Sequence, residues 1–97
     1  MEVHLQEGFD SEPVVLRING RTVFEEDVVT TNLMLGVATT FEVDLAGAPG
    51  PLEVEVVLPA RDVDERISLL RPPPQLGLSV QGGRVVARVA DEPFGYL

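Results

Sequence analysis

The sequence predicts an all-β domain, an antiparallel sandwich of two sheets with about seven or eight short strands. Three observations predict this fold. Apolar and polar residues alternate in several segments, two glycine-containing dipeptides have the form of tight hairpin turns, and the candidate strands recur roughly every ten residues. A small β-barrel could be built from the same strands and is the alternative.

The clearest strand runs from Leu52 to Leu58. Its apolar residues occupy alternate positions and are expected to face the core, whereas Glu53 and Glu55 lie between them and are expected to face solvent. Residues 41–45 repeat this alternation just upstream, and a loop rich in glycine and proline, residues 46–51, separates the two segments. We therefore expect the two strands to pair as an antiparallel hairpin with a long connection.

A first tight hairpin is expected at Asn19-Gly20. Both residues tolerate the positive φ that a type I′ turn demands, and apolar segments flank them on each side. A two-residue turn fixes the register of the two strands, so three cross-strand pairs follow from it. The expected pairs are Ile18 with Arg21, Leu16 with Val23, and Val15 with Phe24.

A second tight hairpin is expected at Gly82-Gly83. Apolar residues alternate on both sides of this dipeptide, and a single register places all of them on one face. A slip of one residue would move half of them into water, so the register is well specified. The expected pairs are Val80 with Val85, Leu78 with Ala87, and Leu76 with Val89.

The remaining segments carry weaker signals. Val3 and Leu5 predict a short N-terminal strand, and residues 67–70 predict another that ends before the prolines at 72–74. Residues 28–35 are rich in β-branched side chains and predict a strand, with a helical turn as the alternative. Residues 61–66 predict a polar loop or a single helical turn.

Length and composition limit the class of protein. The 97 residues make one domain, 1–97, without a cysteine for a disulfide or a thiolate metal site. The formal net charge of −9 disfavours nucleic acid and membrane surfaces as partners, and no apolar run is long enough to span a bilayer. The N-terminus lacks the pattern of a signal peptide, so a cytoplasmic location is expected if Met1 is the native start.

Residues 14–56 carry a series of short motifs in a fixed order. They are Leu16-Arg17-Ile18-Asn19-Gly20, Val29-Thr30-Thr31, Gly36, Phe41-Glu42-Val43-Asp44-Leu45, Gly50 and Leu52-Glu53-Val54-Glu55-Val56. This order resembles the transthyretin-like or carboxypeptidase-regulatory-type sandwich domains, although Leu52 stands where such domains often have an aromatic residue. An immunoglobulin-like sandwich without its Cys and Trp landmarks fits nearly as well. The resemblance implies the fold class and carries over no functional residue.

Residue types that catalysis needs are scarce. His4 is the single histidine, and we expect it to be exposed on an edge strand near the terminus. No lysine is present, and no serine lies in a Gly-x-Ser-x-Gly motif. We therefore expect a protein that is not an enzyme and needs no cofactor. A hydrolase remains a third hypothesis because two carboxylate pairs lie on the polar faces of expected strands, Glu42 with Asp44 and Glu53 with Glu55.

Two acidic segments are candidate calcium sites, since oxygen-rich loops of sandwich domains can supply the ligands that Ca²⁺ prefers. They comprise Asp62, Asp64 and Glu65 in one segment, and Glu25, Glu26 and Asp27 in the other. Arg61 and Arg66 would neutralise the first cluster, and neither segment has EF-hand spacing. A module that binds Ca²⁺ or carbohydrate is therefore the alternative function, although the scarcity of aromatic residues counts against sugar stacking.

The C-terminal tail is the remaining candidate. Phe94, Tyr96 and Leu97 follow the last expected strand in a chain that has few aromatic residues. They are expected either to fold back and close one end of the core, or to dock a partner by strand addition. The leading hypothesis is a non-catalytic interaction or structural module that binds another protein, or a second copy of itself as a homodimer, through a sheet edge or face.

Overall fold

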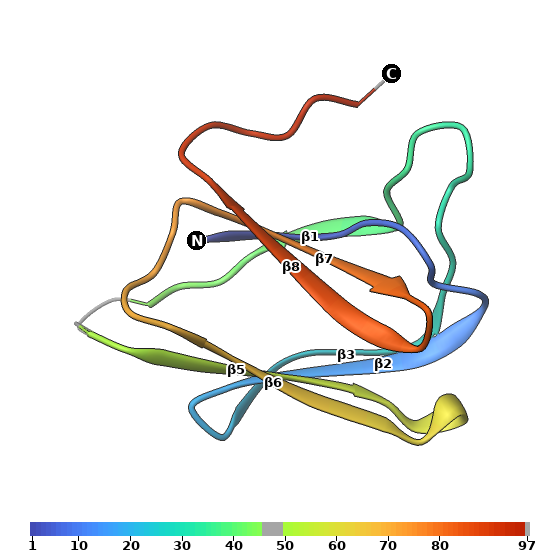
Figure 1. The fold of residues 1–97 in the computed structure, drawn as a ribbon, viewed down its shortest axis with the longest axis horizontal. Helices are drawn as coiled ribbons and strands as arrows, with labels where there is room; N and C mark the ends of the chain where they lie inside the picture. Colours follow the sequence, from blue (N-terminus) through green and yellow to red (C-terminus); the bar gives the residue numbers. More distant parts are fainter. Residues whose placement is uncertain (46–49, 97) are drawn as a thin grey trace.

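The computed structural model describes residues 1–45 and 50–96. Within them the chain forms eight strands and one short 3₁₀ helix, η1 (Pro59–Arg61). Figure 1 shows the strands arranged in two layers. The strands are β1 (Glu2–Leu5), β2 (Glu12–Ile18), β3 (Arg21–Val29), β4 (Thr39–Glu42), β5 (Leu52–Leu58), β6 (Val63–Leu69), β7 (Gln75–Gln81) and β8 (Arg84–Ala90).

The layers are two four-stranded sheets. Sheet A has the order β4-β1-β7-β8, and sheet B has the order β3-β2-β5-β6. The sheets do not close into a barrel, so the predicted all-β sandwich is confirmed and its barrel alternative is wrong. The prediction of purely antiparallel sheets needs correction. Strand β1 pairs antiparallel with β4 but parallel with β7, which enters sheet A after the chain has passed through β5 and β6 of sheet B.

The core lies between the sheets and takes alternate residues from their strands. In β2 and β5 every second residue is buried, as the period of two requires. Burial of these apolar side chains is the main stabilising contribution, at roughly 25 cal/mol per Å² removed from water. The largest of the fully buried side chains are Val3, Leu5, Val14, Leu16, Leu52, Val54, Val56, Leu58, Leu76 and Leu78.

The hairpin at Gly82-Gly83 has the predicted register. Val80 pairs with Val85, Leu78 with Ala87, and Leu76 with Val89. The hairpin at Asn19-Gly20 also forms, with positive φ at both turn residues and Ile18 opposite Arg21. The next pairs differ from the prediction, because a bulge shifts β3 by one residue. The observed pairs are Leu16 with Phe24 and Val15 with Glu25.

The predicted pairing of residues 41–45 with Leu52–Leu58 is wrong. Strand β4 pairs with β1 in sheet A, whereas β5 lies between β2 and β6 in sheet B. Alternation shows which side of a strand is apolar, but it does not select the neighbouring strand. A contact between the sheets accompanies the observed pairing, since the rings of Phe24 in β3 and Phe41 in β4 stack with centroids 4.5 Å apart. Most of the loop predicted between the two strands, residues 46–49, lies outside the described residues.

Two other boundaries differ from the prediction. Strand β6 begins at Val63 and pairs along its whole length with β5, so residues 63–66 are strand and not loop. Charged residues on both faces of β6 hide its alternation in the sequence. Strand β3 ends at Val29, and residues 30–38 form a loop closed by an isolated bridge between Asn32 and Val37. In the part of the chain that the structure describes, no helix is long and apolar enough to cross a membrane.

Candidate functional site

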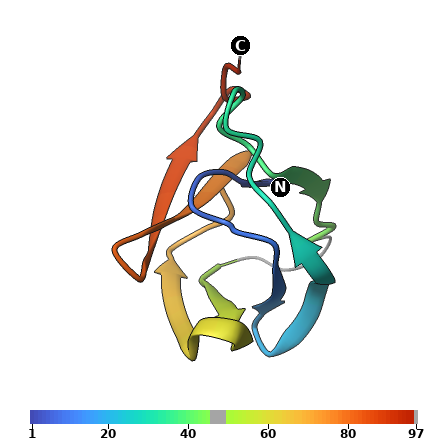
Figure 2. The ribbon, with the colours of Figure 1, turned by 90° about the vertical axis from the view of Figure 1, so that its right-hand side faces the viewer.

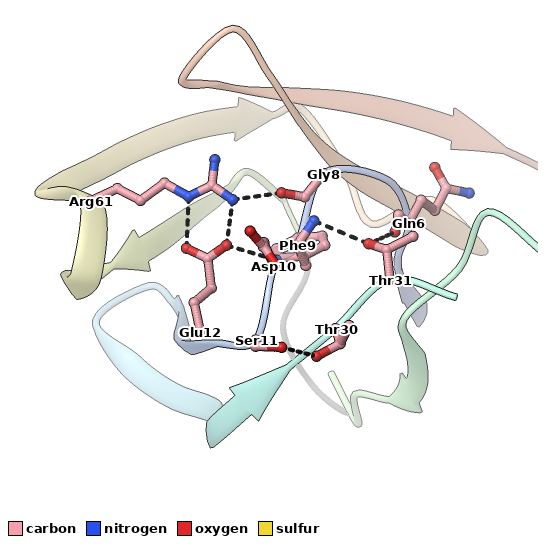
Figure 3. Close-up of polar contacts among 9 residues, drawn as sticks. All are labelled: Gln6, Gly8, Phe9, Asp10, Ser11, Glu12, Thr30, Thr31 and Arg61. Atoms are coloured by element: carbon pink, nitrogen blue, oxygen red, sulfur yellow. Dashed lines mark hydrogen bonds and ion pairs between the residues drawn. The ribbon is translucent and has the colours of Figure 1, made fainter. Parts of the chain in front are cut away.

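Two polar clusters flank the segment that links β1 to β2. The first is the corner shown in Figure 3, where Glu12 is only 4% exposed. The Arg61 guanidinium donates to both carboxylate oxygens of Glu12, with 2.8 Å from Nε to Oε1, and also to the Gly8 carbonyl at 2.6 Å. The Asp10 amide donates to Oε2 at 3.0 Å. The buried charge of Glu12 is therefore fully partnered.

Burial by itself raises the pKa of Glu12, but the hydrogen bonds from Arg61 and the Asp10 amide outweigh it, so the net pKa of this carboxyl is lowered. Thr31 completes the corner: its hydroxyl donates to the Gln6 carbonyl at 2.7 Å and accepts from the Phe9 amide at 3.0 Å. Because these groups satisfy one another, the corner is a structural clamp that joins β2 and η1 to the β1–β2 segment and to the start of the 30–38 loop, and it offers little to a ligand.

The second cluster lies on the outer face of sheet A, where the C-terminal tail (residues 91–96) covers His4. The prediction of an exposed histidine on an edge strand is wrong, since His4 is 3% exposed and β1 is an inner strand between β4 and β7. The Phe94 ring packs edge-on against the imidazole, with centroids 4.9 Å apart. The Tyr96 hydroxyl lies 2.8 Å from His4 Nδ1.

Hydrogen bonds continue from His4 in both directions. His4 Nε2 lies 2.6 Å from Gln75 Oε1 and 3.0 Å from Glu2 Oε1, both of which can only accept. The Gln6 amide donates to the Tyr96 hydroxyl at 3.0 Å. The two acceptors beside Nε2 assign a ring proton to that nitrogen, and Nδ1 is assigned as the acceptor of the Tyr96 hydroxyl.

The tail prediction is therefore correct in one respect. Phe94 and Tyr96 fold back onto the domain, but they cover the outer face of sheet A and do not close the core between the sheets. Leu97 lies outside the described residues. Sequence patterns did not assign His4, Gln6 and Gly77 to this face. The sequence signal for this close packing was Gly77, a glycine within an alternating strand. A Cβ on Gly77 would lie only 2.6 Å from Gln6 Oε1, so the absence of a side chain lets Gln6 pack against β7.

The loop of residues 30–38 projects on the same side of sheet A as the tail (Figures 1 and 2). Its tip is a turn held by hydrogen bonds: Asn32 Oδ1 accepts from the Met34 amide at 3.0 Å and from the Leu35 amide at 3.3 Å. The Asn32 carbonyl accepts from the Gly36 amide at 2.8 Å. This turn holds Leu33 94% exposed and Met34 84% exposed. We call residues 33–35 the apolar tip.

A pocket of about 220 Å³ lies between the apolar tip, the tail and the strands of sheet A. Leu35 and Gly36 border it from the loop, and Gly95 and Tyr96 border it from the tail. Its remaining lining comes from the segment after β1 and from the outer faces of β7 and β8. The pocket, the apolar tip and the tail together are the candidate functional site.

The acidic residues predicted as a calcium site do not converge. Asp64 and Glu65 are consecutive in β6 and face opposite ways: Glu65 accepts hydrogen bonds from the Val85 amide and from Arg84 Nε, whereas Asp64 meets Glu55 on the outer face of sheet B. Asp62 is exposed and ends η1. The segment 25–27 is exposed on β3. Among residues 1–45 and 50–96, no three His, Cys, Asp or Glu side chains are placed to hold a metal ion.

These contacts also change the acidities of the carboxyl groups. The Val85 amide and then Arg84 lower the pKa of Glu65 by stabilising its charged form. The hydrogen bond to Glu55 raises the pKa of Asp64, since two carboxylates this close favour one shared proton.

The carboxylate pairs of the hydrolase hypothesis have ordinary surroundings. Glu53 is exposed as predicted, but Glu55 is half-buried, with Arg17 Nη1 3.2 Å away and Arg66 3.8 Å away. Arginines on the neighbouring strands thus pair with Glu55 on the outer face of sheet B. Glu42 and Asp44 are exposed and border an open pocket of about 500 Å³. Neither pair shows the buried, convergent arrangement that acid–base catalysis uses.

Comparisons with known proteins supply no relative: no family model, no curated protein and no solved structure matches this chain. The resemblance to transthyretin-like domains therefore stays a prediction. The fold defines the chain as a small two-sheet β-sandwich, and its function has to be argued from the geometry described above.

Proposed function

We propose that this protein is a non-catalytic interaction module that docks a partner protein through the apolar tip and the adjoining outer face of sheet A. The observation that carries the proposal is the exposure of Leu33 and Met34, 94% and 84%, in a turn that the chain's own hydrogen bonds hold in place. Clustered apolar side chains on a surface usually mark an interface, whereas single ones do not.

The form of the loop supports docking. A floppy loop loses conformational freedom when it binds, and this cost reduces affinity. Here Asn32 already holds the backbone of the tip, so Leu33 and Met34 can be buried in a partner without much further ordering. Leu35 and Val86, 40% and 39% exposed, extend the apolar surface toward the pocket.

Charge narrows the choice of partner. Two copies of a chain with net charge −9 repel each other, and so do this chain and a nucleic acid. A different protein with a neutral or basic apolar groove is the partner that these features favour. Self-association is the competing outcome, and sedimentation at high concentration measures it directly.

The test places a photo-cross-linking residue at position 33 or 34 in cells that produce the protein. The matched control is position 70, since Leu70 is also apolar and 90% exposed but stands outside the candidate site. We expect positions 33 and 34 to cross-link to one defined protein that position 70 does not capture.

Affinity for the purified partner should then fall at least about tenfold in the double variant Leu33→Ser, Met34→Ser and stay unchanged in Leu70→Ser. Equal cross-linking from position 70, or unchanged affinity of the double variant, would contradict the proposal. A cross-link to a second copy of the same chain would show that the apolar tip forms a homodimer and does not dock a different protein.

A further inference from the structure

The pocket beside the apolar tip has a cation on its lining. Arg88 of β8 stacks its guanidinium over the Phe94 ring, 4.8 Å from the centroid, and reaches Gln6 Oε1 through a long contact of 3.4 Å. Among the described residues, no carboxylate pairs with it. The tail and Gln6 thus orient a guanidinium whose remaining donors are open to a ligand.

The same pocket has an anion on its lining. The backbone of Glu7 is fixed, since its amide donates to Ser79 Oγ at 3.2 Å and its carbonyl accepts from the Val80 amide at 2.8 Å. Its carboxylate lies toward Gly36 at the loop, 3.5 Å from where a Cβ on that glycine would be. In residues 1–45 and 50–96 no cation pairs with this carboxylate. The anion lies on the loop side and the cation on the tail side.

Neutral groups complete the lining. The hydroxyl of Ser79 and the amide of Gln81 can donate or accept, and Leu35 and Val86 are apolar. The volume of about 220 Å³ is below the roughly 300–1,000 Å³ of sites for drug-sized ligands, so it suits a small molecule. The net charge of −9 disfavours a phosphate or a dicarboxylate, whereas a ligand without net charge is not repelled.

We propose that this pocket binds a small zwitterion, a free α-amino acid with a short apolar side chain. Arg88 receives the α-carboxylate, Glu7 receives the α-ammonium, and the side chain lies against Leu35 and Val86. A guanidinium and a carboxylate that have no ion-pair partner in residues 1–45 and 50–96 line one small pocket, and they match both charged groups of such a ligand. This site adjoins the docking surface and shares Leu35 and Val86 with it, but it does not use Leu33 or Met34.

The test uses the intact protein and three ligands of one series: L-valine, N-acetyl-L-valine, which lacks the ammonium, and L-valinamide, which lacks the carboxylate. Binding is followed by the amide resonances of Ser79, Val86 and Gly95 in a titration into the millimolar range. We expect saturable shifts with L-valine and at least about tenfold weaker binding of each derivative, since each leaves one charged protein group without its partner. No saturable shift with L-valine, or equal affinity for the three ligands, would overturn the proposal.

Two variants assign the charges. Arg88→Gln is expected to remove the preference for L-valine over L-valinamide, and Glu7→Gln the preference over N-acetyl-L-valine. Arg71→Gln and Glu25→Gln are the matched controls, since both residues are exposed and neither lines the pocket. An unchanged spectrum away from the pocket shows that a variant is folded. Retained discrimination in a folded Arg88→Gln or Glu7→Gln variant would contradict the assignment.

The amino-acid series needs no variant and leaves Leu33 and Met34 intact, so it can fail without affecting the docking proposal.

Discussion

The Glu12 corner and the pocket on the outer face of sheet A differ in whether their charges are partnered. In the corner, the carboxylate of Glu12 meets the Arg61 guanidinium and a backbone amide, and Arg61 also binds the Gly8 carbonyl. On the outer face of sheet A, Arg88 and Glu7 line one pocket without an ion-pair partner among the described residues. Partnered buried groups stabilise the fold, whereas oriented but unpartnered groups are available to a ligand. The difference separates a structural cluster from a candidate site within a few residues of each other.

The largest expected effect follows from Gly8→Ala. Gly8 has φ +90°, and a Cβ there would lie 2.0 Å from the Val80 carbonyl oxygen, which belongs to backbone and cannot move cheaply. The change would strain the backbone and separate the chain after β1 from β7. We expect a loss of about 3 kcal/mol or more in the free energy of unfolding, measured by urea denaturation. Gly82→Ala is the control for φ alone, since its added Cβ would meet no neighbour; equal losses in the two variants would show that the close approach contributes nothing.

Arg61→Met tests the corner directly. It leaves the buried Glu12 carboxylate without its cation, and removing one partner of a buried pair costs about 3–5 kcal/mol. The Arg61 side chain is 32% exposed, so we expect a smaller loss of about 2–3 kcal/mol in the free energy of unfolding. Arg66→Met removes a more exposed arginine and should cost well under about 1 kcal/mol. If the two variants were equally stable, the corner would not be the clamp that we describe.

Acid should weaken the same corner. The pKa of Glu12 is lowered in the folded state, so its contribution is present above the ordinary glutamate pKa of about 4.3 and is lost as the pH falls through the lowered value. The loss is expected to be smaller than in Arg61→Met, because a protonated Glu12 keeps an oxygen that can accept from Arg61. Unfolding measured between neutral and acidic pH should be less pH-dependent in Glu12→Gln. An unchanged pH dependence in that variant would assign the effect to other carboxyls.

Tyr96→Phe is expected to have the smallest effect on stability. It removes the hydroxyl that joins His4 Nδ1 to the Gln6 amide but keeps the ring, and one such hydrogen bond contributes about 1 kcal/mol. The informative result is local: amide exchange should rise in β1 and in the tail and stay unchanged in sheet B. Phe94→Leu keeps the hydrogen bonds and serves as the comparison. Faster exchange throughout the domain would mean that the tail supports the core as the corner does.

Much of the fold could be predicted from local patterns, whereas the candidate site could not. The register of the Gly82-Gly83 hairpin follows from two neighbouring segments of apolar alternation and a turn of fixed length. The burial of His4 follows from no local pattern, because Phe94 and Tyr96 cover it from the far end of the chain. The apolar tip was predicted as part of a strand or a helical turn, since three apolar residues in succession do not reveal that Asn32 turns them toward solvent.

The sequence by itself determined the all-β class, the two tight hairpins and the apolar faces of β2, β5 and β7, because each depends on residues that are near one another in the chain. Tertiary structure alone decided that β4 joins β1, that β1 runs parallel to β7, and that the tail and the apolar tip border one pocket over sheet A. These arrangements depend on contacts between segments that are distant in sequence, such as the stacking of Phe24 on Phe41 and the packing of Gln6 on Gly77. Alternation specifies which face of a strand is buried, but only the assembled sheets specify what lies beside it.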